Sequence, residues 1–264
     1  MPTFEAHPKY EHDSPDALGV LVVNLGTPDA PTTSSVRRYL REFLSDPRVV
    51  EYPRWLWWLI LNLVILVIRP AKSAHAYREI WTDAGSPLLF HSRDIATALQ
   101  DKLSERLQGN VSVALAMTYG SPSVEAGLNE LHAAGARRII VLPLYPQYSG
   151  TTTASVFDAV FAAISRRRWV PELRLINHYH DEPGYTSAAA ASIREHWQQN
   201  GRGEHLVFSF HGLPEGNLEK GDPYHCHCLK TARLISESLD LEEGSWTVAF
   251  QSRVGREEWL KPYT

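Results

Sequence analysis

Cysteine is scarce in this chain of 264 residues, which contains only Cys226 and Cys228. Two cysteines cannot form the disulfide framework of a small secreted domain, so we expect a reducing cytoplasm. Residues 1–17 also lack the basic start and apolar core of a signal peptide, and we interpret them as a disordered leader. Positive charge is not in excess either: the net charge of -4 gives no electrostatic case for binding nucleic acid.

Several common motifs are missing. No G-x-G-x-x-G follows the first predicted strand and no P-loop lysine motif occurs, which argues against a nucleotide-dependent enzyme such as a generic α/β transferase. No G-x-S-x-G occurs, which argues against a serine hydrolase of the α/β type.

Long hydrophobic runs are limited to Trp55–Ile68, which has 14 residues, no charge, and an arginine at each end. A membrane-spanning helix needs about 20 apolar residues, so we expect this run to be too short to span. Two interpretations remain open from the residues alone. The run is a buried helix or an apolar loop, or it lies at a membrane interface, where tryptophans favour the headgroup level.

The rest of the chain alternates short apolar runs with amphipathic segments. This alternation predicts an α/β fold whose mostly parallel sheets are flanked by helices. A break at residues 181–184 indicates a hinge between two such units. We expect strands over 18–25, 111–117, 138–144, 173–177, 205–209 and 246–251, and helices over 32–44, 74–81, 88–107, 124–134, 152–167, 185–199 and 226–239.

The best single candidate for chemistry is His211, because ligands of open α/β sheets bind beyond the carboxyl ends of strands. His211 directly follows the run Leu206–Phe210 and precedes Gly212. Because glycine has no side chain, a ligand can approach His211 closely. Histidine suits proton transfer near neutral pH because its unperturbed pKa is about 6.5. A lone histidine is more often structural, so both roles stay open on this evidence.

Two other clusters have a structural and a functional interpretation. The hydroxyl-rich segment 146–153 could line a site, or could simply cap the next helix through Ser149 or Thr151. The sequence His225-Cys226-His227-Cys228 offers metal ligands, but structural zinc usually needs a second pair of ligands and there is no other cysteine. We therefore expect the start of a helix with incidental thiols.

Several motifs, taken in order, resemble the ferrochelatase family. They cover about residues 18–264, and their number and order make the resemblance far more specific than any one motif. They are Val23-Asn24-Leu25-Gly26-Thr27-Pro28, Tyr77-Arg78, Gly85-Ser86-Pro87-Leu88, residues 144–153, Phe208-Ser209-Phe210-His211-Gly212-Leu213-Pro214, Gly221-Asp222-Pro223-Tyr224, and Gln251-Ser252-Arg253-Val254-Gly255 with Trp259-Leu260.

The resemblance implies a lyase that inserts Fe²⁺ into protoporphyrin IX to make protoheme, in the last step of heme biosynthesis. It implies two Rossmann-like, chelatase-type domains: residues 18–180, with an apolar lip at 52–70, and residues 181–264. The porphyrin would bind between them. His211 would be the catalytic residue that helps remove the pyrrole protons and meets the metal. The remaining matches are porphyrin-contacting positions: Leu25, Tyr77, Ser86, Tyr145 and the pocket wall Trp259.

The resemblance also bears on location and cofactors. In relatives the apolar lip touches the membrane, which favours a cytoplasmic protein held peripherally at the inner membrane through residues 55–68. Fe²⁺ is then a substrate, and we expect no prosthetic group. Some relatives hold an iron–sulfur cluster on four cysteines. Two cysteines cannot hold one, and Gly150 stands where the animal enzymes place a ligand. No pattern indicates an oligomeric state.

One departure from the family concerns the end of the chain. Relatives continue beyond the segment that matches Thr264 and carry a glutamate, in a motif like His-Ile-Glu-Thr-Leu, that faces the histidine. No such motif occurs here, so we expect a truncated second domain. Two alternatives follow: another class II tetrapyrrole chelatase, acting on coproporphyrin or inserting cobalt, or an inactive porphyrin-binding fragment.

Overall fold

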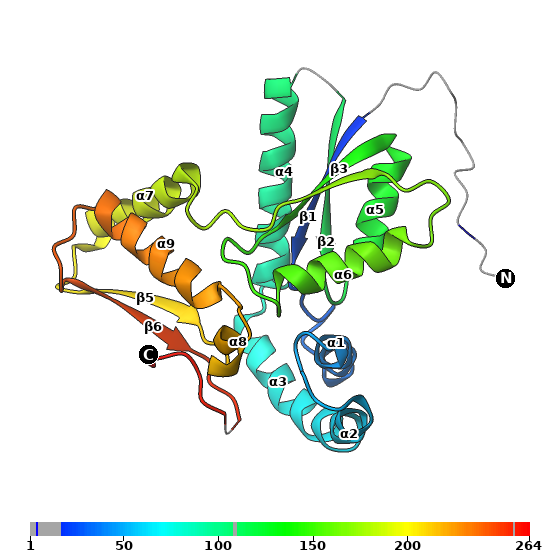
Figure 1. Cartoon of the computed structure of the whole chain (residues 1–264), viewed down its shortest axis with the longest axis horizontal. Helices are drawn as coiled ribbons and strands as arrows, with labels where there is room; N and C mark the ends of the chain where they lie inside the picture. Colours follow the sequence, from blue (N-terminus) through cyan, green and yellow to red (C-terminus); the bar gives the residue numbers. More distant parts are fainter. Residues whose placement is uncertain (1–3, 5–16, 108–109, 256) are drawn as a thin grey trace. The chain divides into compact units, whose positions relative to one another are not determined.

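The computed structural model describes residues 4, 17–107, 110–255 and 257–264, and its chain divides into two compact units (Figure 1). Unit 1 runs through Leu144 and includes Gly150–Ile176; unit 2 consists of Tyr145–Ser149 and Asn177–Thr264. Both units are mixed α/β, as expected. Apart from Phe4, the expected leader through residue 16 lies outside the described residues, while Ala17 already belongs to the first strand.

This division differs from the expected domains 18–180 and 181–264. The turn at Tyr145–Ser149 belongs to unit 2 because its polar groups bond to residues of that unit. Gln147 Nε2 donates to Thr231 Oγ1 over 3.0 Å, and Ser149 Oγ donates to Asp222 Oδ2 over 2.9 Å. Contacts between residues distant in sequence thus decide where this turn belongs.

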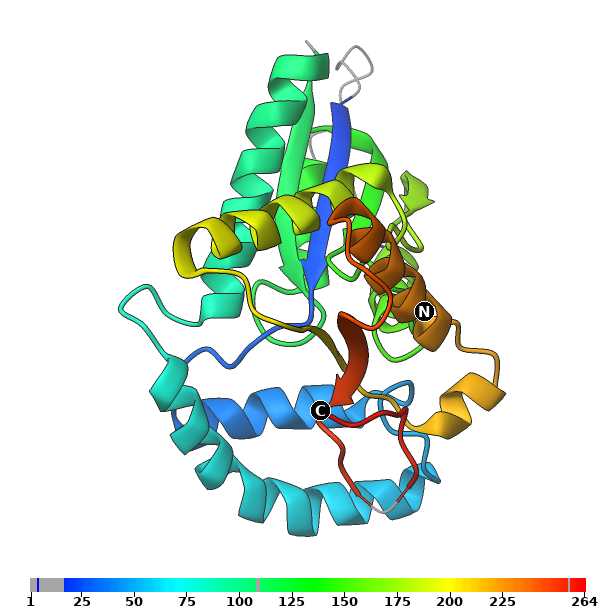
Figure 2. The same cartoon turned by 90° about the vertical axis from the view of Figure 1, so that its left-hand side faces the viewer.

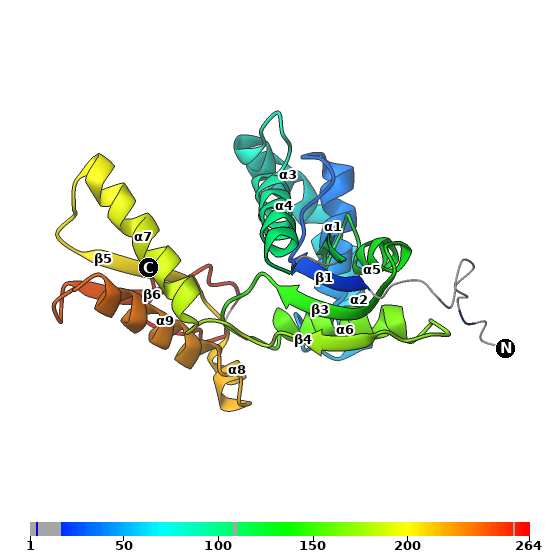
Figure 3. The same ribbon diagram turned by 90° about the horizontal axis from the view of Figure 1, so that it is seen from above.

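Unit 1 is built on a parallel sheet in the order β2-β1-β3-β4. Three of its strands, β1, β3 and β4, lie side by side when seen from above (Figure 3). The run Val20–Val23 of β1 is almost completely buried, which is typical of a strand that is paired on both sides and covered on both faces. The strands are β1 (Ala17–Asn24), β2 (Val111–Met117), β3 (Ala136–Pro143) and β4 (Glu172–Leu175); the flanking helices are α4 (Pro87–Leu107), α5 (Val124–Ala133) and α6 (Thr153–Ile164).

Unit 2 contains a parallel pair of strands, β5 (Leu206–His211) and β6 (Trp246–Gln251), in which His211 lies opposite Gln251. Two long helices, α7 (Pro183–Asn200) and α9 (Tyr224–Ser238), pack against each other beside this pair (Figure 1). Their contact buries Ala190, Ile235 and Leu239. A short helix, α8 (Glu215–Glu219), was not expected from the sequence.

The expected strands all form within two residues at each end, and β6 has the expected bounds. Gly201 follows α7 with a φ of 85°, a positive value that glycine adopts readily because it has no Cβ. One helix prediction was wrong: residues 74–81 do not start a separate helix. They end a continuous helical segment that begins at Arg54.

That segment consists of α2 (Arg54–Ile60), a π-helical turn η1 (Leu61–Ile65) and α3 (Leu66–Ile80). It has 27 residues and is long and apolar enough to cross a membrane, judged by length and composition alone. The expectation that it is too short was wrong because the helix continues past the uncharged run. It is not a buried helix either, since only 17% of its most apolar window is buried.

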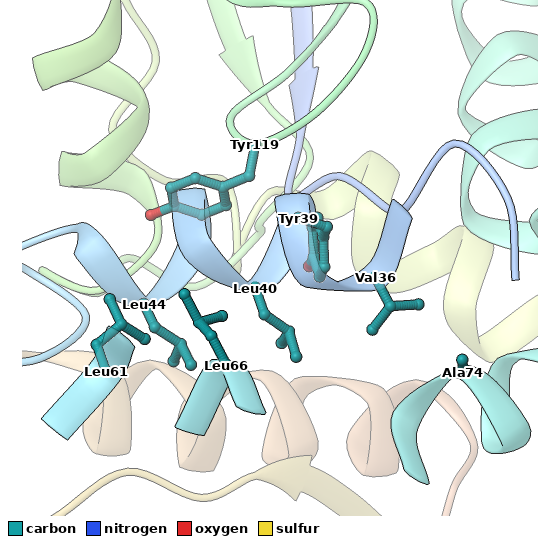
Figure 4. Packing of buried hydrophobic residues seen from close by; sticks show 8 residues of the cluster. All are labelled: Val36, Tyr39, Leu40, Leu44, Leu61, Leu66, Ala74 and Tyr119. Carbon is teal, nitrogen blue, oxygen red and sulfur yellow. The ribbon is translucent and has the colours of Figure 1, made fainter. Parts of the chain in front are cut away.

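One face of the 54–80 helix packs on α1 (Thr33–Ser45), which begins after the cap residue Thr32. Figure 2 shows the two helical segments, blue and cyan, running alongside each other. The apolar positions of α1 recur at helical spacing and therefore lie on one face. The packed residues shown in Figure 4 are Val36, Tyr39, Leu40 and Leu44 of α1, Leu61, Leu66 and Ala74 of the long helix, and Tyr119.

A polar contact also joins α1 to the long helix. Pro70 lies inside α3 and has no N–H, so the carbonyl of Leu66, four residues earlier, lacks its usual helical donor. Arg37 of α1 supplies a donor instead, through Nε at 3.0 Å from this oxygen. The proline thus creates an acceptor that α1 satisfies.

We predict that Arg37→Ala lowers the free energy of unfolding by about 1–2 kcal/mol, because the Leu66 carbonyl loses a charged donor. In a Pro70→Ala background the restored N–H can bond to the same carbonyl, so the loss on removing Arg37 should shrink. The measurement is a double-mutant cycle by urea unfolding. Arg41→Ala, an exposed residue on the same helix, serves as the control. Fully additive effects of the two substitutions would contradict this account.

Candidate functional site

His211 is the last residue of β5, and its side chain is exposed. Its Nδ1 lies 2.6 Å from the carbonyl oxygen of Gly212. Because a carbonyl only accepts hydrogen bonds, Nδ1 carries the proton in the neutral ring. The lone pair is therefore on Nε2, where it can accept a proton or bind a metal ion.

The backbone after His211 is held close to the end of β6. Gly212 N donates to Gln251 O over 2.7 Å. A Cβ on Gly212 would lie 2.9 Å from that oxygen and 3.2 Å from Cε3 of Trp259, so only glycine fits without a shift. This close approach brings the ring of Trp259 to 6.4 Å from the ring of His211. The structure thus brings these two expected site residues together.

Trp259 is fixed by pairing between the last residues of the chain and the loop after β5. Pro214 forms an antiparallel bridge with Trp259, and Leu260 N donates to Leu213 O over 2.9 Å. Leu260 is buried in the unit 2 core beside Phe250. The C-terminal residues therefore anchor the indole beside the histidine.

The third expected site residue of unit 2, Tyr145, is half-buried and begins the turn at Tyr145–Ser149. The turn does not supply the helix cap considered from the sequence. The cap position of α6 is Thr152, which makes no side-chain cap bond, and Ser149 donates to Asp222 instead. The polar groups of this turn therefore form hydrogen bonds to other residues of unit 2.

The other three expected residues belong to unit 1. Leu25, directly after β1, and Tyr77, near the end of α3, both pack partly buried against the α1 cluster. Burial raises the pKa of Tyr77, and a hydrogen bond with Tyr39 partly opposes this. Ser86 is buried and accepts a hydrogen bond over 2.9 Å from Oγ1 of Thr27. Leu25 thus begins the loop after β1, Ser86 bonds to that loop at Thr27, and Tyr77 packs against the same cluster as Leu25.

The metal interpretation of His225–Cys228 finds no support in the described residues. These residues lie in the first turn of α9, which begins at Tyr224, so their side chains point in different directions around the helix. Cys226 is exposed, whereas Cys228 is buried, and burial raises the pKa of its thiol to about 12. A protonated thiol in the core acts as an apolar side chain, as the expectation of incidental thiols implies.

Sequence reasoning missed a cluster of histidines in unit 2. The rings of His180 and His227 stack with centroids 3.7 Å apart, and His178 lies 5.1 Å from His180 and 5.0 Å from His227. The pattern His178-Tyr179-His180-Asp181 is visible in the sequence and could have drawn attention. The approach of His227, almost 50 residues away, has no local signal.

Burial lowers the pKa of His180 to about 4, and repulsion by His227 adds to this, while Asp181 opposes it. The pKa of His227 is also lowered, chiefly by burial. Because the folded pKa of His180 lies below its unfolded value, the unfolded chain binds the extra proton as the pH falls. The contribution of His180 to the free energy of unfolding is therefore highest above about pH 6.5, and it falls as the pH decreases toward 4.

We therefore predict that stability falls between about pH 6.5 and pH 4, and that His180→Gln makes this decline shallower. The measurement is urea unfolding at a series of pH values, with His196→Gln, an exposed residue of α7, as the control. A direct check is the imidazole ¹H NMR titration of His180, whose ring should stay neutral at pH 5.5. A midpoint near 6.5 would refute the prediction.

Comparisons with known proteins agree with this architecture. A model of the ferrochelatase family matches residues 17–264. The chain is 58% identical to the ferrochelatase of Thioalkalivibrio sulfidiphilus over 99% of this chain and 71% of that protein. It is 57% identical to the ferrochelatase of Nitrosococcus oceani, over 98% and 70%, and 51% identical to that of Chromobacterium violaceum, over 100% and 72%. With matches of this extent and identity, the chain belongs to the ferrochelatase family.

Proposed function

We propose that this chain is an enzyme that inserts Fe²⁺ into protoporphyrin IX, the last step of heme biosynthesis. The observation that carries the proposal is the family match over residues 17–264. The placement of His211 supports it, since a neutral imidazole with a free Nε2 lone pair stands at the carboxyl end of a parallel strand.

The proton transfer that this reaction needs is the task of His211. A porphyrin releases two pyrrole protons when it takes up a divalent ion. The Gly212 carbonyl holds the proton on Nδ1 of His211, so Nε2 can accept one pyrrole proton at a time and pass it on to water. While Nε2 carries no proton, it is also a suitable ligand for the incoming Fe²⁺, because neutral imidazole binds iron well.

Each unit contains residues that match porphyrin-contacting positions. Trp259 presents an aromatic face beside His211, and Leu25 and Tyr77 present partly buried apolar surface in unit 1. Tyr145 and Ser86 complete the set of matched positions. Apolar and aromatic contacts made away from the reacting nitrogens can supply binding energy that distorts the ring toward the transition state.

We predict that His211→Ala abolishes metal insertion while porphyrin affinity stays within a few-fold of wild type, since the apolar contacts remain. Insertion is followed by the absorbance change of the porphyrin on adding Fe²⁺ under anaerobic conditions, and affinity by a prior porphyrin titration. His205→Ala is the matched control, because His205 is an exposed histidine that precedes the same strand. Near-normal turnover by His211→Ala would refute the assigned role.

The same assay separates the alternatives. Faster insertion into coproporphyrin, or with Co²⁺ than with Fe²⁺, would favour another class II chelatase. Porphyrin binding by the wild-type chain without any insertion would indicate a binding protein.

We further propose that the chain is cytoplasmic and binds the membrane peripherally through the 54–80 helix. Its face opposite α1 exposes large apolar side chains: Trp55 by 71%, Trp58 by 60%, Leu63 by 65%, Val67 by 63% and Ile68 by 67%. Such an apolar surface on a folded unit is typical of an interaction site. The other face is packed on α1 and bonded to Arg37, so crossing a bilayer would break the cluster that buries Leu61 and Leu66.

We predict that Trp58→Glu with Val67→Glu lowers binding to anionic phospholipid vesicles by at least about tenfold, because each change removes roughly 1.5–3 kcal/mol of apolar burial. The measurement is vesicle co-sedimentation. The control is Ile95→Glu, an exposed apolar residue of α4. Unchanged binding of the double variant would refute the surface, and resistance of the wild type to alkaline carbonate extraction would indicate a spanning helix instead.

The chain is also proposed to work without an iron–sulfur cluster. Such clusters take four cysteine ligands, and this chain has two cysteines, one of them buried with a pKa of about 12.

A further inference from the structure

We propose that His178, His180 and Asp181 form a second binding site, for a divalent first-row transition metal ion, in unit 2. The site is separate from His211 in sequence and goes beyond the proposed function. Each of the three residues offers one ligand atom, and these atoms lie within 4.8 Å of one another.

The spacing of the ligand atoms fits one ion. Donors bound at about 2.1 Å from an ion are at most about 4.2 Å apart. Nδ1 of His180 and Oδ1 of Asp181 are already 3.7 Å apart. His178 is exposed, so there is room for its side chain to move the remaining distance toward them.

A second observation points independently to a ligand. His180 is only 3% exposed, and its Nδ1 is buried without a hydrogen bond to any described residue. A buried polar atom without a hydrogen bond costs free energy, so native proteins rarely keep one without a reason. A metal ion that binds this nitrogen would remove the cost.

The ion pair of Asp181 with Lys230 also suits metal binding, because it occupies only one of the two carboxylate oxygens. Lys230 Nζ binds Oδ2 of Asp181 at 2.6 Å and leaves Oδ1 to face His180.

Neighbouring groups orient the ligands. Nδ1 of His178 donates a hydrogen bond over 3.0 Å to Oδ1 of Asn177, which leaves the Nε2 lone pair for a metal. His227 differs: its Nδ1 accepts a hydrogen bond from Tyr148 N at 3.2 Å, so the proton of the neutral ring is on Nε2. We therefore assign His227 as a positioning residue that stacks on His180, and not as a ligand.

The ligand types define the class of ion. Two imidazoles with one carboxylate suit Fe²⁺, Co²⁺, Ni²⁺ or Zn²⁺, whereas Mg²⁺ and Ca²⁺ prefer sites made of oxygen ligands only. Three protein ligands leave coordination positions for water, so the ion can exchange.

The test is a titration of the metal-free chain with Co²⁺, followed by its visible absorption and by calorimetry. The background is His211→Ala, which removes the other proposed metal-binding nitrogen. We expect this chain to bind one Co²⁺, and His178→Ala and Asp181→Asn each to weaken the binding at least about tenfold. Mg²⁺ should not compete at similar concentrations.

The controls keep the result interpretable. His180 is buried, so its substitution can unfold the site; the exposed His178 and the conservative Asp181→Asn therefore carry the test. His196→Ala, an exposed histidine of α7, should bind as the parent does. The proposal fails if the His211→Ala chain binds no Co²⁺, if His178→Ala and Asp181→Asn bind it unchanged, or if Mg²⁺ displaces it.

Discussion

Parallel pairing of strands is the constraint on which both units depend. Parallel strands end at the same edge of a sheet, so the residues that directly follow them lie close together. In unit 1, Leu25 follows β1 in this way, and the buried Thr27–Ser86 bond fixes the loop beside it. In unit 2, His211 and Gln251 end two paired strands, and the contact of Gly212 with Gln251 determines the position of Trp259.

The 54–80 helix has two apolar faces with different surroundings. Its packed face depends on α1, through Leu61, Leu66 and the Arg37 bond to a carbonyl that Pro70 leaves without a helical donor. Its other face stays exposed and strongly apolar. A proline inside a helix normally destabilises it, but here the acceptor that it creates is bound by the neighbouring helix. The helix therefore exposes one apolar face while its other face is packed on α1.

The sequence was sufficient for most of the fold because the signals there are local. Alternating strands and helices, the Val-rich β1 and the Gly201 helix end all follow from neighbouring residues. It failed where the deciding contact is distant or weak. The sequence predicts only separate parts of the 54–80 helix, because polar residues follow Ile68. It assigns the turn at 145–149 to the first domain, because the partners of this turn on α9 lie about 80 residues away. His211 was identified by its place after a strand, and its neighbour Trp259 only by resemblance.

The histidines of unit 2 show how surroundings set what one side chain can do. His211 is exposed, and a backbone carbonyl selects its tautomer, so the lone pair of the neutral ring is on Nε2. His180 is buried, stacked on His227 and beside a carboxylate, so its ring stays neutral well below neutral pH. His227 has its Nδ1 engaged by a backbone N–H and cannot offer Nε2 as a ligand. Hydrogen bonds at Nδ1 set the tautomers of His211 and His227, whereas His180 has a buried Nδ1 without a hydrogen bond to any described residue.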